Sequence, residues 1–372
     1  MKKIGVAILG LDAYGGGTYR ILTKNRELYQ KTQNVDIEIV CVLEKDGDRV
    51  KSLNVPEDKI AGNIAEVVGN PDVNVVVESI GDTALAKEYA LAALKIGKSV
   101  ILSNIELYAT NSEELERAAK RHNAALFFGA CMGGIPVVRM LLDGLTGDSI
   151  CSVVGTVSDE AVAKYQLAVL SSLAFKAKVG CDKVKMEPLK SVSDTDRKTG
   201  CALGYKLKLL FGGKKCDDGI SLGVYPVLVK KTHPLGATAN AVLLKGDNAG
   251  EIVLSDSAEN PFSYGSAIVS DVIYAATHIE IKYPTFSYEE KNFTEDDFSA
   301  YYLRLTVNEA GALAKVTSAL AKSRIDVVEM NACDNTIVLI TTPTRLSTLN
   351  SAVEKINASA LATVSSIVKV IY

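Results

Sequence analysis

The stretch Lys3 to Gly17, "KIGVAILGLDAYGGG", decides how the N-terminal part of the chain folds. Its first half is a nearly continuous apolar run that stops at Gly10, as expected for a buried strand. After the glycines, apolar residues recur at helical spacing, at Tyr19, Ile21, Leu22 and Leu28. A strand, a glycine-rich turn and a helix in this order predict the opening of a βαβ unit.

The same alternation continues to residue 130. Predicted strands over 35–44, 73–81, 99–104 and 124–130 alternate with predicted helices, which lie over 64–71, 83–98 and 112–123. Apolar strands separated by helices are typical of a parallel sheet covered on both faces. The sequence therefore predicts an α/β protein in which residues 1–130 form a doubly wound, Rossmann-type domain of the nucleotide-binding kind.

Beyond residue 130 helices and strands are mixed, so we expect an α+β domain over 131–280, in which a helix near 265–278 returns to the first domain. Residues 281–298 are polar, acidic and aromatic without periodicity, and we interpret them as a linker. Residues 299–372 have the order strand, helix, strand, strand, helix, strand. This order predicts a ferredoxin-like C-terminal domain.

The composition excludes several classes of function. Hydrophobic residues make up 48% of the chain and charged residues 23%, and the formal net charge is -3, so we expect no nucleic-acid partner. No segment is long and apolar enough to span a bilayer, and no membrane partner is expected. The seven cysteines are odd in number and lack the short spacing of a metal knuckle or redox pair, which favours the reducing cytoplasm.

The glycine turn carries an unusual residue. In a G-x-G-x-x-G turn the middle glycine lets the backbone approach a pyrophosphate, but here the turn has Gly10, Asp12 and Gly15. A carboxylate about 4 Å from a phosphate charge costs about 4 kcal/mol at an effective dielectric constant of about 20. Two interpretations stay open. Asp12 caps the following helix and no cofactor binds, which we favour, or the turn still holds NAD or NADP.

Other polar residues give weaker signals. Glu44 ends the second predicted strand, where an acidic residue accepts a ribose 2′-hydroxyl in NAD sites, but a solvated loop charge is an equal alternative. The three histidines, His122, His233 and His278, lie far apart in the sequence. We therefore expect no metal site.

Several runs, taken in order, resemble the homoserine dehydrogenase family. They are "GLDAYGGGTYRIL", "VVESIGDTALAKEYALAALKIGKSVILSNIELYA", "GGIPVVRMLLDGLTGDSI", "QLAVLSSLAF", "LGYKLKLL", "HPL" and "GSAIVSDVI". The C-terminal segment resembles an ACT domain, the amino-acid-sensing module attached to many of those enzymes. The resemblance implies hydride transfer between a nicotinamide cofactor and aspartate semialdehyde or homoserine, with lysines that polarise the carbonyl and handle protons.

The residues that the resemblance assigns to this chemistry are changed. Where the family reads T-A-N-K, this chain reads L-S-N-I, so an expected lysine is Ile105, and Ser103 and Asn104 remain as candidates for cofactor binding. Where the family has an aspartate and a lysine before L-A-x-L-x-S-L-A-F, this chain has Val162 and Gln166. We therefore expect a degenerate catalytic site.

Further family features are also altered. Gly129 replaces a glutamate that helps to form a cation site, "SDEAVAKY" stands where a longer substrate segment is expected, and "SDSAENPFSYGS" replaces a glycine-rich cofactor segment. Lys164 and Asp159 lie near the lost positions, but a solvated helix face is the more plausible role for them. An apolar residue in place of a buried charge is what a pocket without catalysis would accept.

The ACT-like segment has its own candidate site. ACT domains usually read D-x-P-G at the turn between the first strand and helix, where they bind a small amino acid near free helix amides. Here the candidates for ligand binding are Asn308, Glu309, Ala310, Gly311 and Leu313. Amino-acid sensing and dimerisation alone are equally favoured.

Three functions follow from these features. The one we favour is a homoserine dehydrogenase-like protein without dehydrogenase activity, which needs no cofactor and acts as an amino-acid-sensing or regulatory subunit. The alternative is an active NAD(P)-dependent homoserine dehydrogenase. The third is a structural subunit that assembles with an enzyme of the aspartate pathway. In each case the resemblance implies a homodimer or a higher homo-oligomer.

Overall fold

The computed structural model describes residues 1–256, 261–278, 291–333 and 335–372. The chain divides into two compact units, and each is described by itself. The first unit holds Met1–Gly147, Ala168–Cys181 and Asp256–Ser287, and the second unit holds Asp148–Leu167, Asp182–Ser255 and Tyr288–Tyr372. Residues 281–290 of the predicted linker and 257–260 of the segment "SDSAENPFSYGS" lie outside the described residues.

The first unit contains the predicted parallel sheet. Its strand order is β2-β1-β3-β4-β5, and the strands are β1 Lys2–Leu9, β2 Val35–Leu43, β3 Val75–Glu78, β4 Ser99–Leu102 and β5 Leu126–Phe127. All of their pairings are parallel. The strand order reverses between β1 and β3, and ligands of such sheets bind beside the carboxyl ends of the strands at this reversal.

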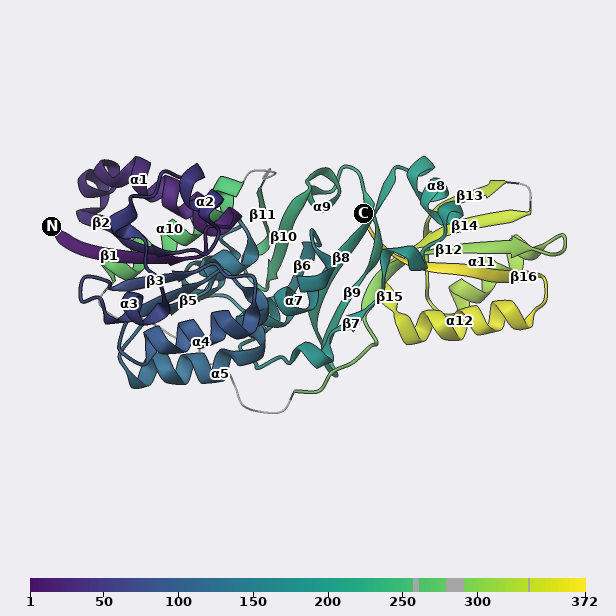
Figure 1. The fold of residues 1–372 in the computed structure, drawn as a ribbon. Coiled ribbons are helices and arrows are strands. Elements are labelled where there is room, and N and C mark those ends of the chain that lie inside the picture. The colour runs from purple at the N-terminus through teal and green to yellow at the C-terminus, as the bar shows by residue number, and fades with distance from the viewer. Residues whose placement is uncertain (257–260, 279–290, 334) are drawn as a thin grey trace. The chain divides into compact units, whose positions relative to one another are not determined.

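Helices cover both faces of this sheet (Figure 1). On one face lie α1 Ala13–Gln33 and α10 Pro261–Thr277, on the other α4 Thr83–Leu94 and α5 Ile105–Arg121, and α2 Gly47–Ser52 and α3 Ile64–Gly69 are short. Val6 and Ile8 of β1 are fully buried, as is Ile268 of α10, which belongs to the same core. A Cβ atom on Gly265 would lie 2.5 Å from the carbonyl carbon of Gly17, so this glycine lets α10 approach α1 closely.

Residues 137–144 form two short helical pieces. Helix α6 covers Val137–Arg139, and a π-helical turn follows over Met140–Gly144. The turn closes with a hydrogen bond from the Leu145 amide to the Met140 carbonyl at 2.8 Å.

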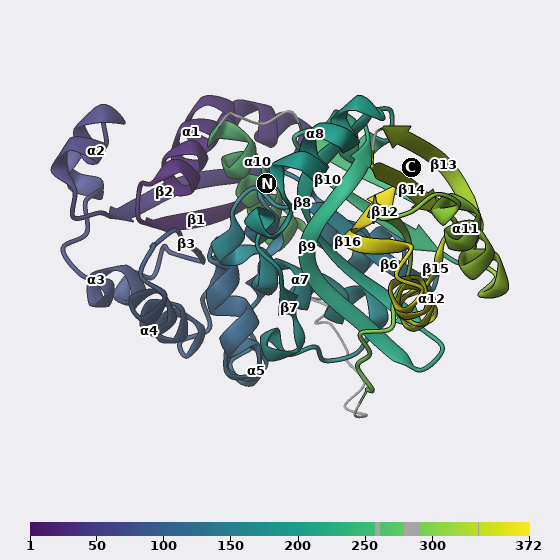
Figure 2. The ribbon, with the colours of Figure 1, turned by 90° about the vertical axis from the view of Figure 1, so that its right-hand side faces the viewer.

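The second unit contains a mixed sheet, whose long strands β8 and β9 dominate Figure 2. The order along the sheet is β11-β10-β6-β8-β9-β16-β12-β14-β13, with β7 beside β9 and β15 beside β12. The strands are β6 Ile150–Thr156, β7 Lys185–Met186, β8 Tyr205–Cys216, β9 Gly219–Lys230, β10 Asn240–Gly246, β11 Gly250–Asp256, β12 Phe298–Val307, β13 Val327–Cys333, β14 Thr336–Thr341, β15 Thr344–Arg345 and β16 Ala362–Ile371. Strand β16 pairs with β9 in parallel and so joins the C-terminal segment to the rest of the sheet.

In the C-terminal segment, strands β12 and β14 are largely buried on both faces. Helices α11 Ala312–Lys322 and α12 Leu346–Ala358 pack on one face, against Tyr301, Leu303 and Leu305. On the other face Tyr302 packs against Tyr205 and Leu228. Strands with two buried faces have apolar runs, as β12 has over residues 300–303.

Three more helices belong to the chain, α7 Glu160–Phe175, α8 Asp194–Ala202 and α9 Pro234–Ala237. The sequence does not predict α8, because its polar sequence "DTDRKTGCA" lacks apolar periodicity. A buried ion pair stabilises it, since Asp196 Oδ1 accepts a hydrogen bond from Arg304 Nε at 2.7 Å and Asp196 is 1% exposed.

Among the described residues, we find no helix that combines the length and the hydropathy needed to cross a membrane.

Candidate functional site

The glycine turn keeps the backbone of a phosphate-binding turn. Gly10 follows β1 with a φ of +88°, a conformation that favours glycine. A Cβ atom on Gly10 would lie 2.0 Å from the Ser79 carbonyl oxygen, and one on Gly15 would lie 2.0 Å from the Gly10 carbonyl oxygen. Both glycines are therefore required by close backbone approach at the reversal of the sheet.

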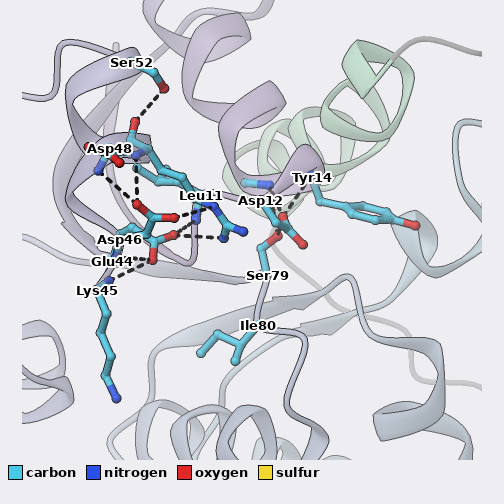
Figure 3. A network of polar contacts seen from close by, with 12 residues as sticks. Leu11, Asp12, Tyr14, Glu44, Lys45, Asp46, Asp48, Ser52, Ser79 and Ile80 are labelled. Atoms are coloured by element: carbon cyan, nitrogen blue, oxygen red, sulfur yellow. Dashed lines mark hydrogen bonds and ion pairs between the residues drawn. The ribbon is translucent and has the colours of Figure 1, made fainter.

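Asp12 occupies the amides at the start of α1 (Figure 3). Its Oδ1 accepts hydrogen bonds from the backbone amides of Tyr14 and Gly15, each at 3.0 Å, and a further one from the Ser79 hydroxyl. The Gly15 amide also donates to the Ser79 hydroxyl oxygen, at 2.9 Å. These are the amides that would meet a phosphate at a helix N-terminus, and an intramolecular carboxylate holds them instead.

The turn has glycines where a phosphate-binding turn needs them, but the Asp12 carboxylate is bound to its amides. A hollow of about 170 Å³ beside the turn is lined by Asp12, Arg20 and Phe262 among others. This volume is about half the lower end of the range of ordinary ligand pockets, about 300 Å³. A pyrophosphate reaches the amides of Tyr14 and Gly15 only when the Asp12 carboxylate leaves them.

Glu44 is held by backbone amides as well. Its Oε2 accepts a hydrogen bond from the Leu11 amide at 2.6 Å, and its Oε1 accepts from Lys45 and Asp46 at 2.8 and 2.9 Å. Burial would raise the pKa of this carboxyl, but the three amides and the Arg49 charge hold it below its usual value. Glu44 thus ties the loop after β2 to the glycine turn, as Figure 3 shows.

Glu78 is an acidic residue that sequence reasoning missed. It ends β3 with no exposed surface, and its Oε1 accepts a hydrogen bond from the Ile80 amide at 2.7 Å. Within the described part of the chain, its Oε2 has no hydrogen-bond partner. Burial, opposed by nearby backbone amides and reinforced by the charge of Asp12, raises the pKa of Glu78 to about 7. The sequence signal that could have identified Glu78 is the run "VVVES", in which an acidic residue ends an apolar strand.

The three candidates after β4 have three different structural roles. Asn104 caps α5, because its side-chain oxygen accepts a hydrogen bond from the Leu107 amide at 2.9 Å. The Ser103 amide donates to the Glu78 carbonyl at 3.2 Å. Ile105 opens α5 and is 5% exposed, so its side chain belongs to the core of the first unit.

Gly129 faces a buried ion pair. Its amide donates to Asp271 Oδ2 at 3.0 Å, and Arg139 Nη2 donates to Asp271 Oδ1 at 2.8 Å. A Cβ atom on Gly129 would lie 2.8 Å from Asp271 Oδ2, so a larger residue would displace that carboxylate. Burial raises the pKa of Asp271 although Arg139 opposes it. No cluster of three metal-binding side chains occurs in the ranges that the structure describes.

The remaining candidates of the middle segment lie on or beside α7. Val162 and Gln166 are half-buried in its first two turns. Asp159 Oδ1 accepts a hydrogen bond from the Ala161 amide at 2.9 Å at the start of the helix. The Lys164 ammonium lies 4.7 Å from the centre of the Tyr165 ring.

The C-terminal candidates surround the start of α11. Asn308 donates its side-chain amide to the Ala360 carbonyl at 2.8 Å, which fixes the turn. Glu309, Ala310 and Gly311 are exposed, and Gly311 has a φ of +82°. Within the described residues no side chain caps α11. Leu313 packs against the core of the C-terminal segment.

Taken together, a parallel sheet with a strand reversal, a glycine turn at that reversal and a mixed second unit define a two-unit α/β chain whose first unit has the Rossmann-type fold of dinucleotide-binding proteins. Two family models match it. The one described as "Homoserine dehydrogenase, NAD binding domain" matches residues 10–129, and the one described as "Homoserine dehydrogenase" matches residues 159–273.

Relatives cover nearly the whole chain. The homoserine dehydrogenase of Bacillus subtilis is 26% identical, over 87% of this chain and 86% of the relative. That of Mycobacterium tuberculosis is 29% identical, over 88% of this chain and 86% of the relative. A solved homoserine dehydrogenase from Thiobacillus denitrificans has a TM-score of 0.84 at 26% identity and covers 100% of this chain and 98% of its own. The chain belongs to the homoserine dehydrogenase family.

These comparisons leave two expectations without support. The relatives are named as dehydrogenases, so a non-catalytic role gains no support from them. The region of the glycine turn matches a family model described as NAD-binding. The expectation that no cofactor is needed therefore has no support from the comparisons.

Proposed function

We propose that this chain is an NAD(P)-dependent oxidoreductase that interconverts homoserine and aspartate semialdehyde, with an affinity for the dinucleotide that Asp12 limits. The observation that carries the proposal is the family match, which extends over both the nucleotide-binding part and the part that follows it. The required glycines of the turn, Gly10 and Gly15, support it as well.

The chain's own residues would act on the dinucleotide through the turn. Gly10 and Gly15 would admit the pyrophosphate to the start of α1, and the amides of Tyr14 and Gly15 would bind it once Asp12 has released them. Glu44 stands at the end of β2, where a ribose hydroxyl would need an acceptor. The nicotinamide ring, when bound, supplies the hydride chemistry.

The direct test is an assay of the purified chain with L-homoserine and NADP⁺ or NAD⁺, followed by absorbance at the wavelength of the reduced nicotinamide. We expect homoserine-dependent reduction of one of the two nucleotides. We also expect faster turnover at limiting nucleotide for Asp12→Asn, because asparagine keeps a helix cap and removes the charge. No reduction by either protein with either nucleotide would contradict the proposal.

A second candidate is a family member that regulates without catalysing. Three observations favour it. Asp12 holds the phosphate-binding amides, Ile105 is buried in the core, and Val162 and Gln166 offer no ionisable group where the family resemblance implies an aspartate and a lysine. In this case the C-terminal segment acts as an ACT-type sensor, with a small amino acid bound at residues 308–313.

Thermal unfolding distinguishes the two candidates, because a ligand of the folded state raises the unfolding temperature. The regulatory candidate predicts a shift with one of threonine, lysine or methionine, lost on Gly311→Val, and no shift with NADPH. The catalytic candidate predicts a shift with NADPH. For either, we propose a homodimer or higher homo-oligomer in the cytoplasm, and for the regulatory candidate also an aspartate-pathway enzyme as partner.

A further inference from the structure

The second unit contains a cavity of about 360 Å³ on one face of its sheet. Side chains from β6, β8, β9, β10, β11 and β16 line it, and the segments around His233 and Phe298 border it. All of its lining residues belong to the second unit. The cavity shares no residue with the glycine turn or with the turn before α11.

The floor of the cavity is apolar. Val154 of β6, Val227 of β9 and Leu243 of β10 are 7%, 1% and 6% exposed. Leu235 of α9 and Ile371 at the end of β16 complete this surface. Such a floor favours a ligand with an apolar chain.

One end of the cavity carries two cations for one anion. Lys369 Nζ donates to Asp297 Oδ2 at 2.9 Å, and Lys214 Nζ lies 3.3 Å from Asp297 Oδ1. The side chain of Asp297 is 1% exposed, whereas those of Lys214 and Lys369 are 30% and 20% exposed. Among these three residues, one positive charge is left over at the cavity wall.

Tyr225 is built into the same end. A Cβ atom on Gly212 would lie 2.5 Å from the Tyr225 hydroxyl, and one on Gly223 would lie 2.8 Å from its ring. The two glycines therefore make room for the ring to lie over the sheet. The Lys369 ammonium is 3.7 Å from the centre of that ring, which favours its charged form.

Two buried polar atoms beside this end lack a hydrogen bond. Among the described residues, the Tyr301 hydroxyl has no hydrogen-bond partner, and Asp297 Oδ1 has none besides its ion pair with Lys214. Tyr301 is close enough to Lys369 and Asp297 for their charges to act on the pKa of its hydroxyl. Buried polar groups without partners are rare in native proteins and call for an explanation.

We propose that this cavity binds a small monocarboxylate with a branched apolar chain. The carboxylate lies against Lys214 and Lys369 and balances the remaining positive charge, and the chain lies over Val154, Val227 and Leu243. A multiply charged phosphate does not match one excess charge and an apolar floor, and a neutral apolar molecule leaves the cation unbalanced. Both 2-amino acids and simple acids have this chemistry.

Titration calorimetry on the full chain tests the proposal with three probes of matched shape, L-leucine, 4-methylpentanoate and 4-methylpentan-1-ol. We expect at least one of the two carboxylates to bind, and the alcohol to bind at least about tenfold more weakly, because a hydrogen bond to a charged group is lost. Tighter binding of leucine than of 4-methylpentanoate would identify the amino acid as the ligand class, and the reverse order would identify the simple acid.

Three variants locate the binding. Lys214→Met removes the more exposed cation and is expected to weaken the carboxylate by about tenfold or more. Val154→Phe fills the floor and is expected to abolish binding. Lys215→Met is the matched control, because Lys215 is the next residue of β8, is exposed and does not line the cavity. We expect this variant to bind the carboxylates with the affinity of the wild type.

Three results would overturn the proposal. The first is that neither carboxylate binds the wild-type chain, and the second is that Lys214→Met and Val154→Phe bind as the wild type does. The third is a second copy covering this face. In that case the molecular mass from sedimentation would be lower for Val154→Phe than for the wild type, and neither carboxylate would bind the wild type. None of these results depends on whether the chain oxidises homoserine.

Discussion

The N-termini of α1 and α11 follow glycines of similar conformation, yet they are closed in different ways. Gly10 precedes α1 with a φ of +88°, and Gly311 precedes α11 with a φ of +82°. At α1 the Asp12 carboxylate holds two backbone amides, whereas within the described residues no side chain caps α11. Gly10 lies two residues before the cap residue Asp12, whereas Gly311 is itself the cap residue of α11 and has no side chain to bind the first amides.

The largest expected effect is on dinucleotide binding at α1. Asp12→Asn keeps an acceptor for the amides of Tyr14 and Gly15 but removes a charge worth about 4 kcal/mol against a phosphate. We expect the affinity for NADPH, measured by calorimetry, to rise on the order of a hundredfold to a thousandfold.

The matched control is Asp82→Asn, because Asp82 caps α4 in the same manner, through the amides of Ala84 and Leu85. This variant is expected to leave the affinity for NADPH unchanged. If the affinity for NADPH rose equally in both variants, or did not rise in Asp12→Asn, the Asp12 charge would not be what limits dinucleotide binding at α1.

The second effect concerns Glu78, whose pKa the Asp12 charge helps to raise. Below about pH 4.5 this carboxyl is protonated in both folded and unfolded states. Between there and its folded pKa of about 7, the unfolded chain ionises first, so stability falls as the pH rises. Glu78→Gln is expected to remove this fall and to gain up to about 3 kcal/mol at pH 8.

Chemical denaturation at pH 5 and pH 8 measures this difference. Asp12→Asn should also lower the folded pKa of Glu78, because it removes a negative charge that raises it. A Glu78→Gln variant with the same pH dependence as the wild type would show that Glu78 ionises normally in the folded chain.

The smallest effect is at α11. Gly311→Ala is expected to destabilise the second unit by about 1–2 kcal/mol, because a side chain is strained at a φ of +82° although nothing lies within 4 Å of the added Cβ. Gly69→Ala is the control, since it also meets open space but lies in helix α3. Denaturation should show a loss only for Gly311→Ala, and equal results would mean that the turn tolerates any residue.

The sequence predicts the order of elements well, because apolar runs and glycine turns are local signals. The strand at "KIGVAIL", the helix after the glycines and the βαββαβ order of the last segment are all present in the structure. The Asp12 cap could be predicted because the cap residue and its amides are near neighbours in sequence.

What the sequence could not give are contacts between distant residues. Helix α8 depends on the pair of Asp196 with Arg304, the replacement at Gly129 is explained by Asp271, and Lys214 and Lys369 meet Asp297 across the second unit. Each partner lies far along the chain, so no periodicity or motif reveals it. These buried ion pairs and contacts can therefore be identified only from the structure.

The most direct measurement is a pair of crystal structures, of the wild type and of Asp12→Asn, both grown with NADPH. In the wild type we expect the Asp12 carboxylate to accept hydrogen bonds from the amides of Tyr14 and Gly15 wherever the diphosphate is absent. In Asp12→Asn we expect the diphosphate to accept hydrogen bonds from both amides. A wild-type structure in which both amides donate to the diphosphate while the Asp12 carboxylate still contacts them would show that Asp12 does not limit binding.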